Sequence, residues 1–214
     1  MRKIRRSWLL GGIGLISCGI VGIARSSVLG APGADVILAL LSDLLWAGAI
    51  LLLSIGLSRE ASVVARSPLG LSASAVVALW PVTATVLGPL VLPQEPTATE
   101  AWQIWAYLSV LIPLISGVIA AMQVARARTV PAPWNGAPLW ALGVQTIVWV
   151  VPQAAGASSP RALIEMAAVL PVLGLLGFLS TTLGLGIVAV TLAGHRRVNT
   201  VPVFESAGPD TPVA

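Results

Sequence analysis

The chain has 214 residues, of which 57% are hydrophobic and only 9% are charged, with a formal net charge of +4. A soluble domain averages about 25% charged residues, so this composition excludes an ordinary soluble protein and predicts membrane helices in contact with the lipid bilayer. The basic excess does not predict nucleic-acid binding, because the basic residues lie in short clusters between apolar runs and not on one polar domain.

Six apolar runs, taken in chain order, predict an all-α fold with one bundle of six transmembrane helices in residues 1–194. The expected spans are residues 8–24, 35–57, 69–92, 102–124, 138–154 and 163–193. A helix needs about 20 residues to cross about 30 Å of hydrocarbon, so the first and fifth runs are short. The sixth run is long enough that either its first turns lie in the interface or the helix tilts. The polar, proline-containing segment 195–214 is expected to be a disordered tail.

The start of the chain has two interpretations. "MRKIRRS" is a basic segment ahead of an apolar run, and "LISC", ending at Cys18, resembles the lipid-attachment motif of a cleaved secretion signal. The apolar run continues past Cys18 through "GIVGIA", whereas the apolar part of such a signal is usually about 7–15 residues long. We therefore expect a retained first helix, with lipid modification of Cys18 as the alternative.

Two polar motifs predict where helices begin. "TATE", Thr97–Glu100, has the spacing of a capping box, in which a hydroxyl and a carboxylate satisfy backbone amides at the start of a helix. Ser159 followed by Pro160 combines an N-cap hydroxyl with a proline at the first helical position. These motifs place the beginnings of the fourth and sixth helices.

The distribution of charge predicts the orientation in the membrane. In a six-span arrangement only Arg25 and Arg161 lie on one side, and ten of the twelve basic residues lie on the other. Those ten are Arg2, Lys3, Arg5, Arg6, Arg59, Arg66, Arg126, Arg128, Arg196 and Arg197. Because cytoplasmic loops carry the excess of basic residues, both termini are expected in the cytoplasm. The eleven arginines against one lysine favour a GC-rich bacterial genome, and therefore the cytoplasmic membrane of a bacterium.

Asp43 is a carboxylate inside the apolar run "ILALLSDLLWAGAILLL", residues 37–53. Counted from Asp35 at 1.5 Å per residue, it lies roughly 12 Å deep in the outer half of the membrane. An ionised carboxylate facing lipid costs at least about 2.5 kcal/mol, so Asp43 should face the bundle interior or a wet cavity, or be protonated. One interpretation is a proton or cation site. The alternative is an interhelical hydrogen bond, with Asp43 protonated or reaching Arg25 or Arg161.

A second set of polar residues lies at similar depth. Gln145 is in the middle of the fifth run, and Thr83 lies near Pro81 in the third, where proline frees a backbone carbonyl. We predict an intramembrane polar site made of Asp43, Thr83 and Gln145. The alternative is ordinary helix–helix hydrogen bonding, which averages about 0.6 kcal/mol per pair.

Small residues repeat on the first and last runs. The predicted packing faces are Gly14, Cys18 and Gly22 on the first helix, and Gly174, Gly177, Thr181 and Gly184 on the sixth. Small side chains let membrane helices approach closely, so we expect internal packing, with a dimer contact as the alternative.

Known catalytic patterns do not occur in the sequence. One cysteine and one histidine, His195, allow neither a multi-cysteine metal site nor a paired-histidine zinc or haem site. "GLSAS" around Ser72 lacks the second glycine of a G-x-S-x-G nucleophile motif, and no nucleotide-binding loop is present. We therefore expect no enzymatic activity, no metal and no cofactor. The first hypothesis is a small transporter or permease-like protein, proton-coupled through Asp43. The second is a non-catalytic assembly protein that packs against a membrane-protein partner or a second copy of itself.

Overall fold

The computed structural model describes residues 2–27, 33–57, 62–65, 67–92, 99–127, 130, 134–158 and 167–195. Within these residues the fold is all-α with six helices, as the sequence predicts. The helices are α1 (Arg2–Ser27), α2 (Ala34–Ile55), α3 (Pro68–Val91), α4 (Thr99–Ala127), α5 (Ala137–Ser158) and a composite sixth helix. The sixth consists of α7 (Leu170–Leu179), the π-helical segment η3 (Ser180–Gly184) and α8 (Leu185–His195). A short 3-10 helix, η2 (Trp134–Gly136), precedes α5.

Five helical segments in the described part of the chain are long and apolar enough to cross a membrane. They are Ile4–Ser26, Ala34–Ile55, Pro68–Val91, Glu100–Ala127 and Leu170–Gly194. Their outward surfaces carry large apolar side chains, such as Ile37 and Leu90, which suit contact with lipid. The chain is therefore a multi-pass membrane protein. α5 covers the predicted fifth run and contains Gln145, Pro152 and Gln153, and it is not among these five segments.

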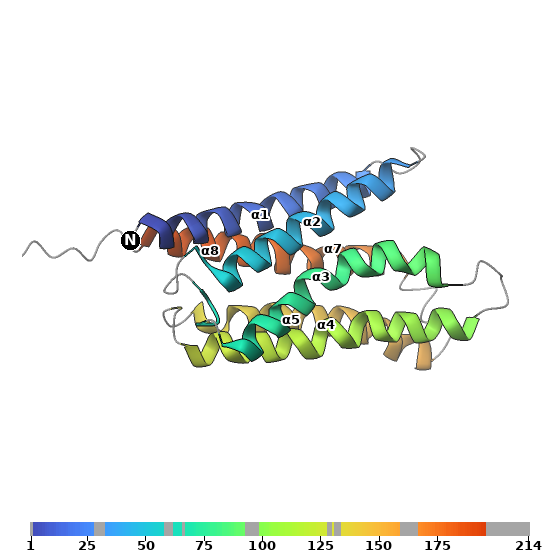
Figure 1. Ribbon diagram of the computed structural model, residues 1–214. Helices are drawn as coiled ribbons and strands as arrows, with labels where there is room; N and C mark the ends of the chain where they lie inside the picture. The colour runs from blue at the N-terminus through green and yellow to red at the C-terminus, as the bar shows by residue number, and fades with distance from the viewer. Residues whose placement is uncertain are drawn as a thin grey trace, which may run out of the picture.

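The helices form a ring in chain order. Each helix packs against the next one along the chain, and α8 packs against α1, which closes the ring. Figure 1 shows successive helices running in alternate directions, so that the start of α1 and the end of α8 lie at the same end of the bundle. This arrangement leaves an interior that all six helices can line.

The observed helix bounds differ from the predicted spans mainly at the two ends of the chain. α1 begins at Arg2, earlier than the predicted residue 8, because the basic segment continues the helix beyond the apolar run. The sixth helix begins at Leu170, later than the predicted residue 163. Residues 163–166, the predicted caps at Thr97 and Ser159–Pro160, and the predicted tail after His195 lie outside the described residues.

A cluster of buried apolar residues lies near the start of α1. It consists of Trp8, Val64, Val124, Val130, Ala189, Leu192 and Ala193. The turn between α2 and α3 folds back onto the bundle, where the Val63 amide donates to the Leu53 carbonyl at 3.1 Å. The Ser67 hydroxyl then accepts from the Gly70 amide at 3.1 Å and caps α3, with Pro68 at the first helical position. This end of the bundle is closed by apolar side chains.

The predicted small-residue faces contact several helices. Gly14 lies against Ala49 of α2, and Gly22 lies against the ring of Phe178 of α7. On the last helix, Gly177 packs against Val148 of α5. Gly174 and Gly184 are exposed, with no described atom within 4 Å of where a side chain would begin.

The closest backbone approach of α1 involves a glycine outside the predicted set. A β-carbon added at Gly12 would lie 2.9 Å from the carbonyl oxygen of Gly186, and one added at Gly186 would lie 3.0 Å from that of Gly12. Because both positions lack a side chain, α1 and α8 touch through their backbones. This contact fixes the closure of the ring.

Candidate functional site

A cavity of about 370 Å³ lies inside the ring, and its volume is near the lower end of small-molecule sites. α1 contributes one side chain to its wall, and each of the other helices contributes a stripe of side chains on one face. The lining residues are Cys18 on α1; Ser42, Asp43 and Trp46 on α2; Val77 and Pro81 on α3; Ser109, Val110, Pro113 and Leu114 on α4; Leu142, Gln145, Thr146 and Trp149 on α5; and Phe178, Thr181 and Thr182 on the sixth helix.

Asp43 is half-buried in this wall, and its hydrogen-bond partner among the described residues is a hydroxyl. Its Oδ2 accepts a hydrogen bond from Thr85 Oγ1 of α3 at 2.6 Å. Of the two arginines considered as partners, Arg25 instead pairs with Asp35, with Nε 2.6 Å from Oδ1, and both side chains are exposed. Arg161 lies outside the described residues. The carboxylate therefore joins α2 to α3 while it faces the cavity.

The structure brings together two of the three predicted site residues. Asp43 and Gln145 line the same cavity. Thr83 is absent from the lining, and its hydroxyl donates to the Leu79 carbonyl of its own helix at 2.9 Å. Thr85 takes the place next to Asp43 that was predicted for Thr83. Thr85 lies four residues after Pro81 and therefore on the same face of α3, and this spacing is the signal that could have identified Thr85.

Prolines free backbone carbonyls along the cavity wall. Pro81 has no amide hydrogen for the Val77 carbonyl, and the Trp46 indole Nε1 of α2 donates to that carbonyl at 3.1 Å. Pro113 likewise has no amide hydrogen for the Ser109 carbonyl. The Ser109 hydroxyl is buried and has no hydrogen-bond partner among the described residues. The Val77 carbonyl therefore accepts a hydrogen bond from the neighbouring helix α2. The Ser109 carbonyl lacks its helical donor at a residue whose hydroxyl is also buried in the cavity wall.

The sixth helix changes to π-helical geometry where it meets the cavity. In the segment Ser180–Gly184, Thr181 Oγ1 and Thr182 Oγ1 each donate to the Phe178 carbonyl at 2.8 Å. These bonds stabilise the wider turn, because they provide donors for a carbonyl displaced from the regular pattern. Single π-helical turns within α-helices occur frequently at functional sites. No sequence pattern considered above predicts this feature.

Cys18 lies deep in the same wall. It is 1% exposed, and its Sγ is 3.4 Å from both the carbonyl oxygen and the hydroxyl of Ser42. The residue predicted to pack helices therefore also lines the cavity next to Asp43. Within the described residues, no three of His, Cys, Asp and Glu are grouped so as to hold a metal ion.

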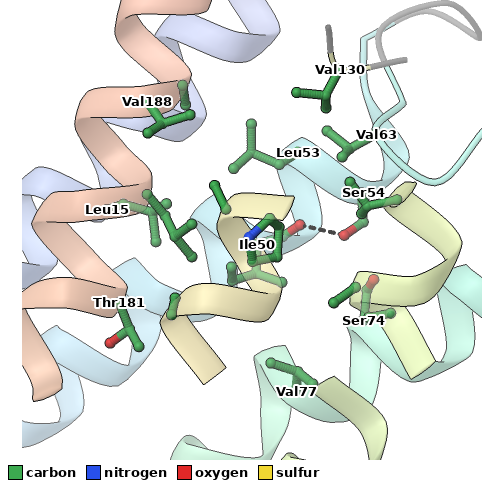
Figure 2. Close-up of a pocket in the computed structure, with 18 of the residues that line it drawn as sticks. Leu15, Ile50, Leu53, Ser54, Val63, Ser74, Val77, Val130, Thr181 and Val188 are labelled. Atoms are coloured by element: carbon green, nitrogen blue, oxygen red, sulfur yellow. Dashed lines mark hydrogen bonds between the residues drawn. The ribbon is translucent and has the colours of Figure 1, made fainter. Parts of the chain in front are cut away.

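A second cavity of about 180 Å³ extends from the first toward the start of α1. Figure 2 shows Thr181 and Val77 at one end of this cavity and Val63 and Val130 at the other, with mostly apolar side chains between them. The two cavities share four lining residues, namely Trp46, Val77, Leu142 and Thr181. These four side chains border both cavities, of which the larger contains Asp43 and the smaller is lined mostly by apolar side chains.

Comparison of the chain with protein-family models, with curated proteins and with solved structures gave no match. The functional assignment therefore depends on the geometry and chemistry of the two cavities.

Proposed function

We propose that the chain is a small, permease-like transporter that binds a proton or a cation at Asp43. The observation that carries the proposal is that Asp43 lines a cavity of about 370 Å³. An aspartate whose role was only to join two helices would be expected to lie sealed between packed side chains. A carboxylate inside a membrane-spanning helix is costly, and its retention at a cavity favours a role in ion binding or proton transfer.

The second cavity supports a pathway through the bundle. It continues from the wall of Trp46, Val77, Leu142 and Thr181 toward the opposite end of the helices. Displacement of the Trp46 ring would join the two chambers. Pro81, Pro113 and the π-helical turn are irregularities at which helices bend, and they occur around this wall.

The proposal includes an orientation and a location. Arg5, Arg6 and Arg126 lie at the end of the bundle where α1 begins, and the Arg25–Asp35 pair and Glu100 lie at the other end. By the positive-inside rule, the arginine-rich end faces the cytoplasm and Asp43 lies in the outer half of a bacterial cytoplasmic membrane. The proposal assigns no catalytic reaction to the chain.

Proton movement in reconstituted vesicles tests the proposal. Vesicles with a trapped pH-sensitive dye receive an imposed membrane potential, alone and with monovalent inorganic or organic cations inside. The purified chain should accelerate proton entry in at least one of these conditions, and Asp43→Asn should reduce the rate about tenfold or more, which is about 1.4 kcal/mol in the barrier. Asp35→Asn is the matched control, because it makes the same chemical change on the same helix outside the cavity. The proposal is wrong if the chain never exceeds protein-free vesicles or if Asp43→Asn matches the unaltered chain.

A second candidate, an assembly protein, is favoured by the uncovered glycines of the last helix. Gly174 and Gly184 are exposed and have open space around them, which would allow a second helix to approach closely. The mass of the chain in detergent distinguishes this candidate. A dimer that is lost in Gly174→Leu would support assembly through this helix, and a monomer would contradict self-assembly.

A further inference from the structure

We infer that the cavity around Asp43 binds a small organic monocation that carries N–H donors and an apolar body, the chemistry of a protonated primary amine. The inference rests on the proposed function, because it names the class of substrate for the same cavity. It is carried by the charge, the hydrogen-bonding capacity and the shape of the cavity wall.

The charge of the wall selects a monocation. Among the described residues that line the cavity, Asp43 alone has a formal charge, and its partner Thr85 is neutral. A charge away from water is stable only when it is paired, so a single positive charge would complete the site. An anion would meet the carboxylate without a compensating cation, and a dication would leave an excess positive charge.

The hydroxyl groups of the wall act mainly as hydrogen-bond acceptors. Thr146 donates its hydrogen to the Leu142 carbonyl at 2.8 Å, and Thr181 and Thr182 donate theirs to the Phe178 carbonyl. A hydroxyl that has donated its one hydrogen retains only acceptor capacity. Together with the Asp43 carboxylate, these oxygens favour a ligand that supplies several N–H donors.

Aromatic rings supply the rest of the specificity. Trp46, Trp149 and Phe178 line the cavity, and Tyr107 contacts Trp149 edge-on with 6.3 Å between the ring centroids. Aromatic faces attract organic cations and also bury apolar surface. A bare metal ion would use the oxygens but not these rings.

The size of the cavity limits the ligand. A volume of about 370 Å³ corresponds to roughly twelve water molecules at about 30 Å³ each. The space exceeds that of a desolvated inorganic ion and is small for a multi-ring compound. The buried Ser109 hydroxyl provides one further polar contact for a ligand at the α4 side of the wall.

Four probes that share one ring test this chemistry on the full-length chain in lipid nanodiscs. Equilibrium dialysis measures the binding of benzylamine, benzyl alcohol, benzoate and benzyltrimethylammonium, with empty nanodiscs as the control for partition into lipid. Benzylamine should bind saturably at one per chain. Benzyl alcohol and benzoate should bind about tenfold more weakly or not at all, because they lack the positive charge. Benzyltrimethylammonium should bind several-fold more weakly than benzylamine, because it has no N–H donor.

Variants locate the binding in this cavity. Asp43→Asn should weaken benzylamine binding about tenfold or more, and Asp35→Asn should leave it unchanged. Equal binding of benzylamine and benzyl alcohol would overturn the inference without any variant. Equal affinities for benzyltrimethylammonium and benzylamine would overturn the requirement for N–H donors.

The binding and flux experiments distinguish an error in the ligand class from an error in the proposed function. If benzylamine does not bind while proton entry into vesicles still depends on Asp43, the amine class is wrong and the proposed function remains. If benzylamine binds through Asp43 but no cation or proton flux occurs, the site is correct and the transport proposal is wrong.

Discussion

The Trp46 indole Nε1 lies 3.1 Å from the carbonyl oxygen of Val77, which is the carbonyl that Pro81 leaves without its helical donor. A helix break in α3 is therefore satisfied by a side chain of α2. The bond also fixes the Trp46 ring, which lines both cavities. The same contact thus links the stability of the α2–α3 pair to the position of a ring that lines both cavities.

Replacement of Trp46 tests this bond through a double-mutant cycle. Trp46→Phe should lower the free energy of unfolding by about 1 kcal/mol through loss of the hydrogen bond, in addition to the effect of the smaller ring. In a Pro81→Ala background the loss should be smaller, because the amide of residue 81 can then donate to the Val77 carbonyl. Unfolding in mixed detergent micelles measures both differences.

The control for this cycle is Trp80→Phe. It removes the same atoms from a half-buried indole that stacks on Trp105 and whose buried Nε1 has no hydrogen-bond partner among the described residues. It should therefore reproduce the effect of ring size without the effect of the bond. An equal cost for Trp46→Phe in both backgrounds would show that the bond does not contribute to stability.

Thr85 is expected to matter more than Thr83, although the two lie within one turn of the same helix. Thr85→Val removes the hydrogen bond to Asp43 and leaves the carboxylate short of a donor, which should cost about 1 kcal/mol of unfolding free energy. Thr83→Val removes only a bond to the carbonyl of its own helix, so it should cost less than about 0.5 kcal/mol. Unfolding in mixed micelles checks both values, and equal costs would contradict the assigned partner.

The sequence identified the helices and the unusual position of Asp43 because both follow from the chemistry of the bilayer. Long apolar runs must form helices, and an intramembrane carboxylate must avoid lipid. The interior position of Asp43 and the presence of Gln145 in the same cavity agree with that argument. The pairing of Arg25 with Asp35 was missed, because an arginine near the end of α1 can reach the nearer and more exposed carboxylate.

Details that depend on helix rotation could not be predicted from a single sequence. Thr83 and Thr85 lie about 200° apart around α3, and a helix that is apolar on most sides does not reveal which of them faces inward. The glycines of α1 allow several alternative contact faces, so the spacing of small residues did not identify Gly12 as the closest contact with α8. The start of α3 follows from a local signal, because the N-cap pair Ser67–Pro68 has the same pattern as Ser159–Pro160.

Gly12 should tolerate even a methyl group poorly. In Gly12→Ala the new β-carbon would lie 2.9 Å from the Gly186 carbonyl oxygen and 2.7 Å from Val190 Cγ2, so α1 and α8 would have to separate. We expect a loss of about 1–3 kcal/mol in unfolding free energy, as for other overpacked interiors. Gly174→Ala is the control, because nothing lies near its added carbon, and it should be neutral or slightly stabilising. Equal stability of the two variants would contradict a direct backbone contact between α1 and α8.

The proposed orientation can be measured by introducing one cysteine at a time and labelling it with a membrane-impermeant maleimide. Ser26→Cys places a thiol at the end of α1 next to the Arg25–Asp35 pair, and Ala65→Cys places one in the turn between α2 and α3 at the opposite end. Both positions are exposed, whereas the native Cys18 is 1% exposed and should not react in either preparation.

Because the basic residues should remain in the cytoplasm, Ser26→Cys should be labelled in intact cells and Ala65→Cys only after the membrane is opened. Labelling of both variants in opened membranes confirms that both thiols are accessible. The reverse pattern in intact cells would invert the orientation and place Asp43 in the cytoplasmic half of the membrane. Labelling of both variants in intact cells would mean that α2, which lies between the two thiols, does not carry the chain across the membrane.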